Sequence, residues 1–551
     1  MASTLLSPGV EIQERDLTVG SIETVEVNVG AIAGAFEKGP VLKPVRIASE
    51  SQLIEIFGQP TEKNANDWWT AASFLQYGGV LDVVRVSTTG QLTASDDNVT
   101  SPYTLSIPTS DVYEATYLSA TSNPFKWAAR SPGKEGNGIK VAIIDKGADV
   151  TLTLDSALTT TTVGTQVATA SGSPNGAKSG FIYAWDATSN KVSILTSDTW
   201  IATDVIENGV TDAVVTAKAD WYDSQVAYGS VNWSSIAPRP GTSPYVAERS
   251  GANDEMHIIV YDATGVITGK PNSLLEKFTY VSKANDAKTS SGAVNYYPTV
   301  ILNSSQYIYW GSHENDAYDV SGNAAIVSGA NFGGTNNAGN PSTTTFDLFS
   351  SDSANRLYTF VKGAEEGSAT AGQIITGMNE FADTETVDID YLLMGGGATS
   401  GKTDHQSIAA KVLSVCSGRK DCVGFISPYY GDVVGVTSST TQTQNVIDFY
   451  DGMQATSFGV FDSGWKYIYD RFADKYRYVP LNGDVAGLCA SVTANGTPWF
   501  SPAGLNRGAI RGAVKLAFSP TKTERDALYQ RRINPVTSLP GQGIVLFGDK
   551  T

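Results

Sequence analysis

The residues with the most recognisable chemistry lie in a glycine-rich segment, GGGATSGKT, at 395–403. Four of them fit the pattern G-x-x-x-x-G-K-[ST]: Gly396, Gly401, Lys402 and Thr403. In such a loop, backbone N–H groups surround phosphates, the lysine adds a positive charge and the threonine binds Mg²⁺. An apolar run at 391–394 precedes the segment, and a helix is expected at 407–417. The spacing therefore raises the hypothesis of a P-loop ATPase or GTPase.

The flanking sequence argues against a nucleotide site. The expected strand at 387–394 contains two aspartates, whereas strands that lead into phosphate loops are almost continuously apolar. Asp404 would place a negative charge beside the phosphates. A working site also needs a carboxylate after a second apolar strand, and the nearest, Asp462, follows a strand weakened by a glycine. We interpret the segment as a solvated strand–helix turn with Thr403 or Asp404 as the helix N-cap, and we expect no cofactor.

Other reactive side chains form no motif. The histidines His257, His313 and His405 are far apart in the sequence, and no C-x-x-C, H-E-x-x-H or G-x-S-x-G pattern is present. The three cysteines are expected to be small buried apolar residues: Cys416, Cys422 and Cys489. A Cys416–His405 pair is conceivable but has no further support. The sequence predicts no metal site and no catalytic residues.

Composition narrows the class of protein. The 551 residues are 41% hydrophobic and 17% charged, with a formal net charge of −18. So acidic a chain is poorly suited to binding nucleic acid, because that requires Lys and Arg to neutralise phosphates. The sequence has no long apolar run and starts without a basic, signal-like region, so we expect no membrane-spanning segment and no signal peptide. Three cysteines suit folding in a reducing cytoplasm.

The pattern of elements changes twice along the chain. Residues 1–24 contain few apolar residues and read as an N-terminal arm, and 25–88 alternate expected strands and helices. Residues 89–365 are rich in Thr, Ser, Asn and Gly, with short alternating stretches typical of strands. The α/β alternation resumes at 366–551. These patterns predict an α/β (α+β) core domain split by a large, mainly β insertion that forms one or two protruding domains.

Several stretches occur in a recognisable order. SPGVEIQERD opens the chain, EKGP and FGQP follow, and the end carries PWFSPAGLNRGAIRG and NPVTSLPGQGIVLFGDKT. In this order they resemble the tail sheath proteins of contractile-tailed, myovirus-type bacteriophages. The matching positions are Pro8, Gly9, Val10, Glu11, Gly39, Pro40, Phe57, Gly58, Pro502, Gly504, Asn534, Pro535, Gly541, Gly543, Gly548 and Asp549.

The resemblance implies a structural protein of the virion without enzymatic activity, assembled in the host cytoplasm. Sheath subunits form six-fold rings around the tail tube, and contraction drives the tube through the host envelope. The implied partners are other sheath subunits, the tail tube protein, and the baseplate and tail terminator proteins, without direct contact to nucleic acid or membrane. The arm would add a strand to a neighbouring subunit, and the β insertion would face outward.

The chain differs from the family in one respect, and other functions remain as alternatives. Family members continue past the position of Thr551, so the chain resembles a sheath protein that lacks its C-terminal end and is expected to be monomeric. The alternatives are the P-loop NTPase, the sheath of a bacterial contractile injection system, and a carbohydrate-binding role for the β-rich region.

Overall fold

The computed structural model describes residues 28–551 except 89, 97–103, 121–122, 160, 172, 174, 208–211, 314–327, 330–331, 333–354, 366–367, 399–400 and 496–498. The expected arm at 1–24 lies outside the described residues, and so do Pro8, Gly9, Val10 and Glu11.

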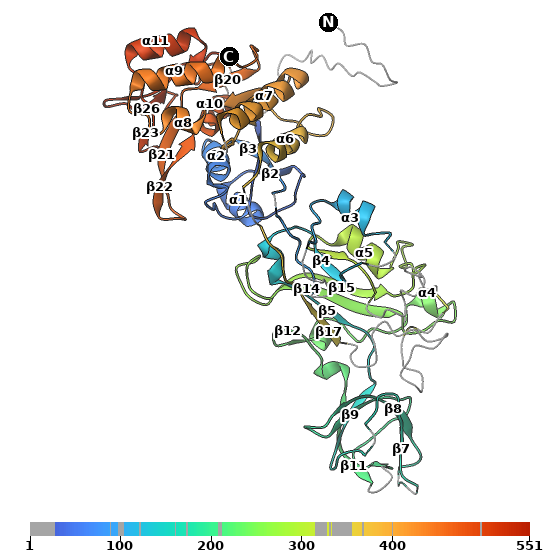
Figure 1. The fold of residues 1–551 in the computed structure, drawn as a ribbon. Coiled ribbons are helices and arrows are strands. Elements are labelled where there is room, and N and C mark those ends of the chain that lie inside the picture. The colour runs from blue at the N-terminus through green and yellow to red at the C-terminus, as the bar shows by residue number, and fades with distance from the viewer. Residues whose placement is uncertain are drawn as a thin grey trace, which may run out of the picture.

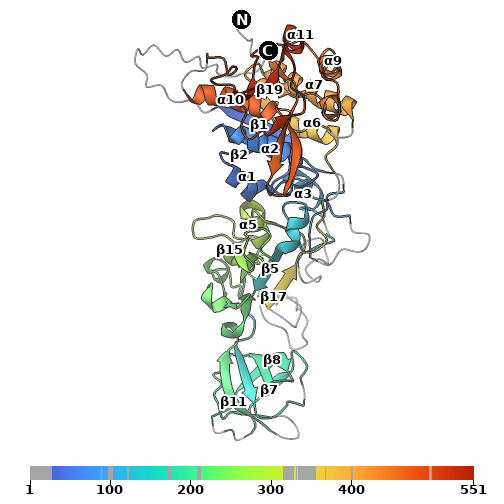
Figure 2. The same cartoon turned by 90° about the vertical axis from the view of Figure 1, so that its left-hand side faces the viewer.

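The molecule is elongated, with three parts in a row that both ribbon views display (Figures 1 and 2). The inner part contains a seven-stranded sheet between helices, the middle part a four-stranded sheet, and the distal part a six-stranded sheet. The C-terminus lies in the inner part, at the end opposite the distal part. The chain therefore mixes helices and sheets, as the sequence predicted.

The seven-stranded sheet combines the two ends of the described chain. Its strand order is β2-β3-β1-β18-β19-β20-β24, and β1 pairs in parallel with β18 with Ala31 opposite Leu392. Only β2 runs antiparallel to its neighbour. The strands are β1 (Val29–Gly34), β2 (Val45–Ile47), β3 (Val80–Arg85), β18 (Tyr391–Leu393), β19 (Val423–Ile426), β20 (Gly459–Asp462) and β24 (Ile533–Asn534). Parallel strands of this kind are apolar on both faces because helices cover both.

Helices cover both faces of this sheet, and each face has its own apolar cluster. One cluster contains side chains of α1 (Glu50–Phe57), α2 (Ala65–Leu75) and α10 (Asn482–Ala494). The other contains side chains of α6 (Ala371–Asn379), α7 (Lys402–Arg419), α8 (Tyr430–Val433), α9 (Ser439–Tyr450) and α11 (Lys522–Gln530). In α7, Ile408, Val412 and Cys416 recur at four-residue spacing and are fully buried, as expected of an amphipathic helix on a sheet.

Smaller strands complete the inner part. They are β21 (Trp465–Asp470), β22 (Lys475–Pro480), β23 (Lys515–Leu516), β25 (Val536–Leu539) and β26 (Gly543–Leu546).

The middle part is built on an antiparallel sheet of order β15-β14-β5-β17. Its strands are β5 (Ile139–Ile144), β14 (Glu255–Asp262), β15 (Ser273–Ser282) and β17 (Asn355–Thr359). Around it lie α3 (Ser110–Thr116), β4 (Trp127–Ala129), the 3-10 helices η1 (Lys134–Gly138), η2 (Tyr222–Ser224) and η3 (Trp233–Ser235), β12 (Val226–Tyr228), β13 (Val231–Asn232), α4 (Pro244–Ala247), α5 (Tyr297–Ser304) and β16 (Ile308–Trp310).

The distal part has its own apolar core around Leu152, Ile182 and Trp200. Its strand order is β10-β11-β6-β9-β8-β7. The strands are β6 (Val150–Leu154), β7 (Gln166–Ala168), β8 (Ser179–Asp186), β9 (Lys191–Leu195), β10 (Val205–Ile206) and β11 (Ala213–Asp220). The chain passes between the middle and distal parts at 145–149 and again at 221.

Two expectations about local structure are wrong. The helix expected at 407–417 begins earlier, at Lys402, with Gly401 as its N-cap rather than Thr403 or Asp404. The N–H of His405 already bonds the carbonyl of Gly401 at 3.1 Å, and Asp404 lies in the first turn, where a negative charge is favourable. The strand expected at 387–394 is confined to Tyr391–Leu393.

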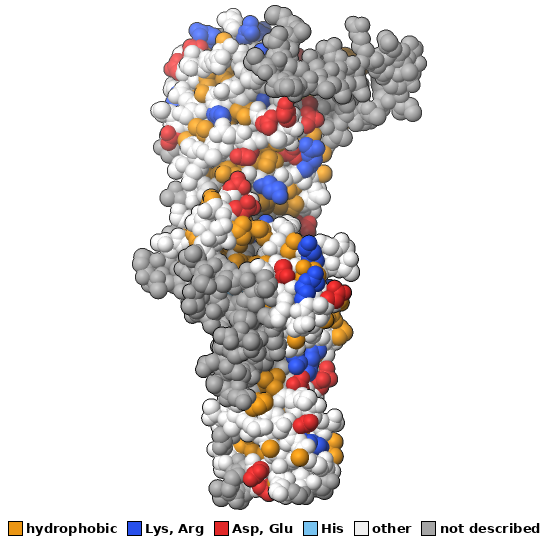
Figure 3. Space-filling model, turned by 90° about the vertical axis from the view of Figure 1, so that its right-hand side faces the viewer, with side chains coloured by type: hydrophobic (Ala, Val, Ile, Leu, Met, Phe, Trp, Pro, Cys, Tyr) orange, Lys and Arg blue, Asp and Glu red, His pale blue; other side chains and the backbone are white. Residues whose placement is uncertain are grey.

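The surface has no extended charged face in the view of Figure 3, where acidic and basic side chains are interspersed among uncharged ones. In the part of the chain that the structure describes, no helix combines the length and apolar character needed to cross a lipid bilayer.

Candidate functional site

The glycine-rich turn follows β18 and leads into α7, the topology that a phosphate loop requires. Gly395 and Gly397 have φ values of 73° and 64°, a region that favours glycine. The turn lies at the carboxyl end of the parallel sheet, beside the ends of β1 and β19, where α/β proteins commonly bind ligands. The location alone would therefore permit a nucleotide.

A carboxylate of the protein itself occupies this turn. Asp67 Oδ1 accepts a 2.7 Å hydrogen bond from the N–H of Gly396, and Asp67 Oδ2 accepts one of 3.1 Å from Ala35. A Cβ at Gly395 would lie 2.8 Å from Asp67 Oδ1, and one at Gly34 would be equally close to its carboxyl group. The glycines thus allow close approach of a carboxylate from α2, in a place where a phosphate loop would hold an anion.

Burial of this carboxylate affects its ionisation. Asp67 is 7% exposed, and burial raises its pKa to about 6, while the hydrogen bonds from Gly396 and Ala35 act in the opposite direction. At neutral pH the group is therefore mainly an anion held by backbone donors. It satisfies two buried N–H groups that would otherwise lack an acceptor.

Lys402 and Thr403, two other residues of the P-loop pattern, contact other groups of the protein. Lys402 Nζ lies 3.0 Å from Asp432 Oδ2, which neutralises the charge that a phosphate would need. Thr403 is exposed, and its carbonyl accepts a hydrogen bond from Ser407 Oγ. Of the four residues, Gly396 donates its N–H to the carboxylate of Asp67, and Lys402 pairs with the carboxylate of Asp432.

Asp462, the nearest candidate for a Mg²⁺ carboxylate, is buried as well. It accepts a 2.6 Å hydrogen bond from Ser427 Oγ and one of 2.9 Å from the N–H of Gly464. Burial raises its pKa to about 8, so the group is largely protonated at neutral pH and is a poor ligand for a hard cation. Within the described ranges, no group of three or more His, Cys, Asp or Glu residues could hold a metal ion.

The remaining reactive side chains are dispersed. His257 Nε2 contacts the carbonyl of Pro238, His313 Nδ1 the hydroxyl of Tyr297, and His405 Nε2 the carbonyl of Ser427. Cys416 contacts Cys422 rather than His405. The structure therefore forms neither a metal centre nor a nucleophile–base pair from these groups.

The N-terminal motif residues in the described chain position α1. Gly39 has a φ of 96°, and the carbonyl of Phe57 accepts a hydrogen bond from the N–H of Lys38. Phe57 is fully buried, with its ring 5.2 Å from that of Phe36, and Gly58 ends the helix with a φ of 82°. Pro40 lies in the same connection.

The C-terminal motif residues come together on one surface of the inner part. Asn534 Nδ2 donates to the carbonyl of Lys550, and the N–H of Lys550 donates to Asn534 Oδ1, both at 2.8 Å. The N–H of Gly504 bonds the carbonyl of Leu546 at 2.9 Å. Pro535, Gly548 and Asp549 lie close by in the chain, Pro502 lines the adjoining groove, and Gly541 and Gly543 shape the β25–β26 hairpin.

An apolar groove adjoins this surface, and no motif in the sequence predicted it. Its volume is about 240 Å³, and side chains of the central sheet, α10 and the chain's last residues line it, among them Val423, Phe425 and Val460. Asn28, the first described residue, donates from its side chain to the hydroxyls of Tyr391 and Thr493, which also line the groove. Nearby apolar side chains are strongly exposed: Trp499 is 73% and Leu505 50% exposed. Contiguous exposed apolar surface is common where proteins bind one another.

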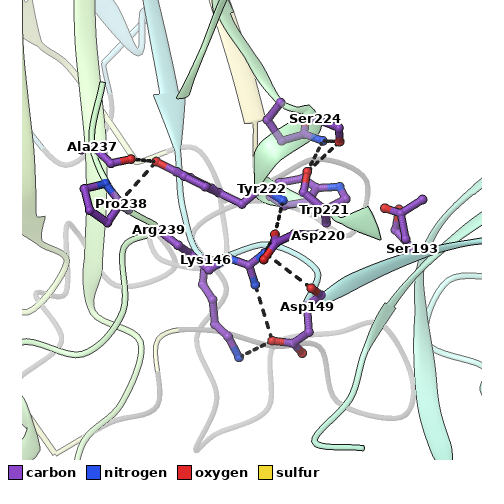
Figure 4. A network of polar contacts seen from close by, with 12 residues as sticks. Lys146, Asp149, Ser193, Asp220, Trp221, Tyr222, Ser224, Ala237, Pro238 and Arg239 are labelled. Carbon is purple, nitrogen blue, oxygen red and sulfur yellow. Dashed lines mark hydrogen bonds and ion pairs between the residues drawn. The ribbon is translucent and has the colours of Figure 1, made fainter. Parts of the chain in front are cut away.

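The joint between the middle and distal parts is a second feature that the sequence did not reveal. Arg239 reaches both connections at once: its guanidinium pairs with Asp220 and lies 3.8 Å from Asp149, which Lys146 also approaches at 3.3 Å (Figure 4). Tyr222 lies 5.7 Å below the guanidinium and donates to the carbonyl of Ala237 at 2.8 Å. One arginine thus links the two connections that hold the distal part.

Comparisons with known proteins point to one class. A model described as "Phage tail sheath protein central domain" matches residues 367–551. The tail sheath protein of Enterobacteria phage T4 is 27% identical over 585 residues, covering 100% of this chain and 82% of that protein. The tail sheath protein of Vibrio phage KVP40 is 28% identical, covering 100% of this chain and 83% of that protein.

Similarity to solved structures is weak. The crystal structure of a sheath tail protein from Listeria innocua aligns with a TM-score of 0.40 and 9% identity, over 96% of this chain and 69% of that one. The sequence matches confirm the resemblance to phage tail sheath proteins. They also confirm a structural rather than an enzymatic class.

Proposed function

From this kinship with phage tail sheath proteins, we propose that the chain is the structural subunit of the contractile tail sheath of a bacteriophage. Many copies form six-fold rings around the tail tube, and the sheath contracts to drive the tube through the host envelope. The observation that carries the proposal is sequence similarity to tail sheath proteins along the whole chain.

The architecture supports an inner and an outer layer. The inner part, from 25–88 and 366–551, would contact the tube and neighbouring subunits. The inserted 89–365 would project outward. The apolar groove and the exposed Trp499 and Leu505 lie on the inner part, which is where contacts between subunits are needed. Asn28 lies at the groove, so an arm at 1–24 would leave the subunit from this surface.

The enclosed turn at 395–403 supports the same conclusion. Asp67 fills the anion position and Lys402 is paired with Asp432, so the energy for contraction would come from rearranged subunit contacts rather than from nucleotide hydrolysis. The baseplate, tail terminator and tube proteins remain proposed partners, and assembly in the host cytoplasm remains a proposal.

Co-assembly with tail tubes tests this function. The chain is expected to be monomeric by itself, but tubes mixed with it should gain an outer layer with six-fold symmetry in negative-stain electron microscopy. A chain without residues 1–20 should leave the tubes bare. Tubes that stay bare with the intact chain at every concentration would overturn the proposal.

A matched control comes from the distal part. Asp149 and Asp220, at the two ends of the distal part, both lie within reach of Arg239, so a short linker can replace residues 150–219. This variant should still coat tubes, because the proposed contacts lie on the inner part. The sheath of a bacterial injection system remains the nearest alternative, and a contractile layer on tubes without a capsid would favour it.

A further inference from the structure

Two buried thiols face each other in the inner part and play no role in the proposed assembly. Cys416 lies in the last turn of α7, and Cys422 directly precedes β19. Their sulfur atoms are 3.5 Å apart, and both residues are at most 1% exposed. The third cysteine, Cys489, lies in α10 and packs in the apolar cluster on the other face of the sheet, so it cannot pair with either.

The connection between the two thiols is rigidly held. Lys420 has a φ of 67° and turns the chain at the end of α7. The Arg419 guanidinium donates to the carbonyls of Phe381 and Val387 at 2.8 and 2.9 Å and pairs with Asp421. Because these contacts fix both ends of the turn, the sulfur atoms have little freedom to separate.

The hydrogen bond between the two sulfur atoms makes the thiols unequal. It holds the pKa of the Cys422 thiol below its usual range, and the nearby Arg419 guanidinium acts in the same direction, while burial and the charge of Asp421 act against them. The pKa of Cys416 is raised by the same hydrogen bond and by burial. The thiolate is the nucleophilic form of cysteine, so Cys422 would react first and Cys416 would be the resolving thiol.

We propose that Cys416 and Cys422 are an oxidation site at which hydrogen peroxide forms an intramolecular disulfide between the end of α7 and the start of β19. The Cys422 thiolate attacks one peroxide oxygen, the O–O bond breaks, and the departing hydroxide takes up the thiol proton as water, which leaves a sulfenic acid. The sulfur of Cys416 then attacks the sulfur of Cys422, the S–O bond breaks, and the oxygen leaves as a second water with the Cys416 proton.

The reaction balances without a further reagent. Two thiols and one hydrogen peroxide give one disulfide and two waters, with the sulfurs oxidised by two electrons and the peroxide reduced by two. The sulfur atoms must approach from 3.5 Å to about 2.05 Å, and rotation of the two side chains about their Cα–Cβ bonds supplies this movement while the turn stays in place. The proposal does not depend on the function of the assembled protein.

Peptide mapping tests the proposal on the full chain. The reduced protein is exposed to graded hydrogen peroxide, unfolded, alkylated and cut with trypsin, which cleaves after Arg419 and Lys420 and so separates the two cysteines. The expected product is peptide 412–419 joined to peptide 421–466 with the loss of two hydrogens, while Cys489 stays alkylated. Thiol counting under denaturing conditions should fall from three to one.

Variants complete the test. Cys489→Ser should form the same linked peptides, whereas Cys422→Ser should leave Cys416 alkylatable at the same peroxide concentration. Alkylation of both Cys416 and Cys422 at peroxide concentrations that oxidise free glutathione would overturn the proposal, and so would sulfinic acid at either residue without linkage. Because the decisive readout is the wild-type map, it stands even where a serine variant fails to fold.

Discussion

Asp67 and Gly396 are separated by 329 residues, yet the carboxylate of one accepts a 2.7 Å hydrogen bond from the backbone N–H of the other. The contact joins the first α/β segment of the chain to the second, across the whole β-rich stretch between them. It also fills a turn whose sequence reads as a phosphate loop. A single buried carboxylate thus links the two segments and occupies the turn at which a nucleotide phosphate would bind.

Asp67→Asn should destabilise the protein. An amide has one acceptor oxygen instead of two, so either Ala35 or Gly396 would lose its acceptor inside the protein. Leaving one buried donor unsatisfied costs about 1–3 kcal/mol. Urea unfolding would measure the loss, with the exposed Asp526→Asn on α11 as the control, expected to stay within about 0.5 kcal/mol of the wild type. Equal stability of the two variants would contradict the role of Asp67.

Magnesium nucleotide should leave the melting temperature unchanged. A ligand that binds only the folded state raises it by mass action, and neither Lys402 nor the turn is free to hold phosphate. Thermal scans with millimolar Mg-ATP and Mg-GTP would check this, alongside Lys402→Ala. A shift that the wild type shows and Lys402→Ala lacks would restore the P-loop hypothesis.

The strand–helix turn could be foreseen from the sequence, but its occupant could not. The turn is recognisable because its signals lie close together in the sequence: the apolar run at 391–394, Gly401 and Lys402. Asp67 lies in another helix, and its place depends on how β1 and β18 pair. The high pKa of Asp462 was also hidden, because it arises from burial by elements far apart in the chain.

The same contrast holds at larger scale. Local patterns predicted a strand before the glycine-rich turn and a helix after it, since periodicity and caps are local signals. The start of α7 was misplaced because two plausible caps, Thr403 and Asp404, lie inside its first turn. The joint at Arg239 and the apolar groove depend on contacts between distant segments, so no short motif predicts them.

Asp462→Asn should change how stability depends on pH. The pKa of Asp462 is about 8 in the folded protein against 3.8 for an exposed carboxyl group. Folding therefore favours the protonated form. The stability that this adds to the folded protein is fully present below about pH 4 and is lost as pH rises to about 8. The asparagine variant lacks this loss, so its stability relative to wild type should increase from about pH 5 to about pH 8.

Urea unfolding at both pH values would measure the difference. Asp67, with a pKa of about 6, adds a trend in the same direction to both proteins and cancels in the comparison. A difference between variant and wild type that stays constant across this range would show that Asp462 titrates normally.

Arg239→Ala should loosen the joint between the middle and distal parts without unfolding either. The guanidinium of Arg239 pairs with Asp220 and approaches Asp149, and the variant lacks both contacts. Each part has its own apolar core and should therefore stay folded. Spin labels at the exposed positions Lys218→Cys and Lys277→Cys would report the distance between the two sheets. The distance distribution should broaden at least about twofold if the two parts become independent, as expected for a loosely joined pair.

Arg249→Ala is the matched control for the joint. Arg249 stacks on Tyr245 and pairs with Glu248, away from both connections, so the distribution should keep its width. Unchanged width in Arg239→Ala would mean that other contacts across the joint, such as that between the rings of Tyr183 and Trp221, fix the distal part.

Immunogold electron microscopy of the virions that carry this chain tests the central proposal most directly. An antibody against the distal part, 150–220, would recognise the segment proposed to face outward from the sheath. The account predicts gold along the whole wall of the tail, at regular intervals and outside the tube. Gold absent from the tail, or confined to the capsid or the tail tip, would contradict it.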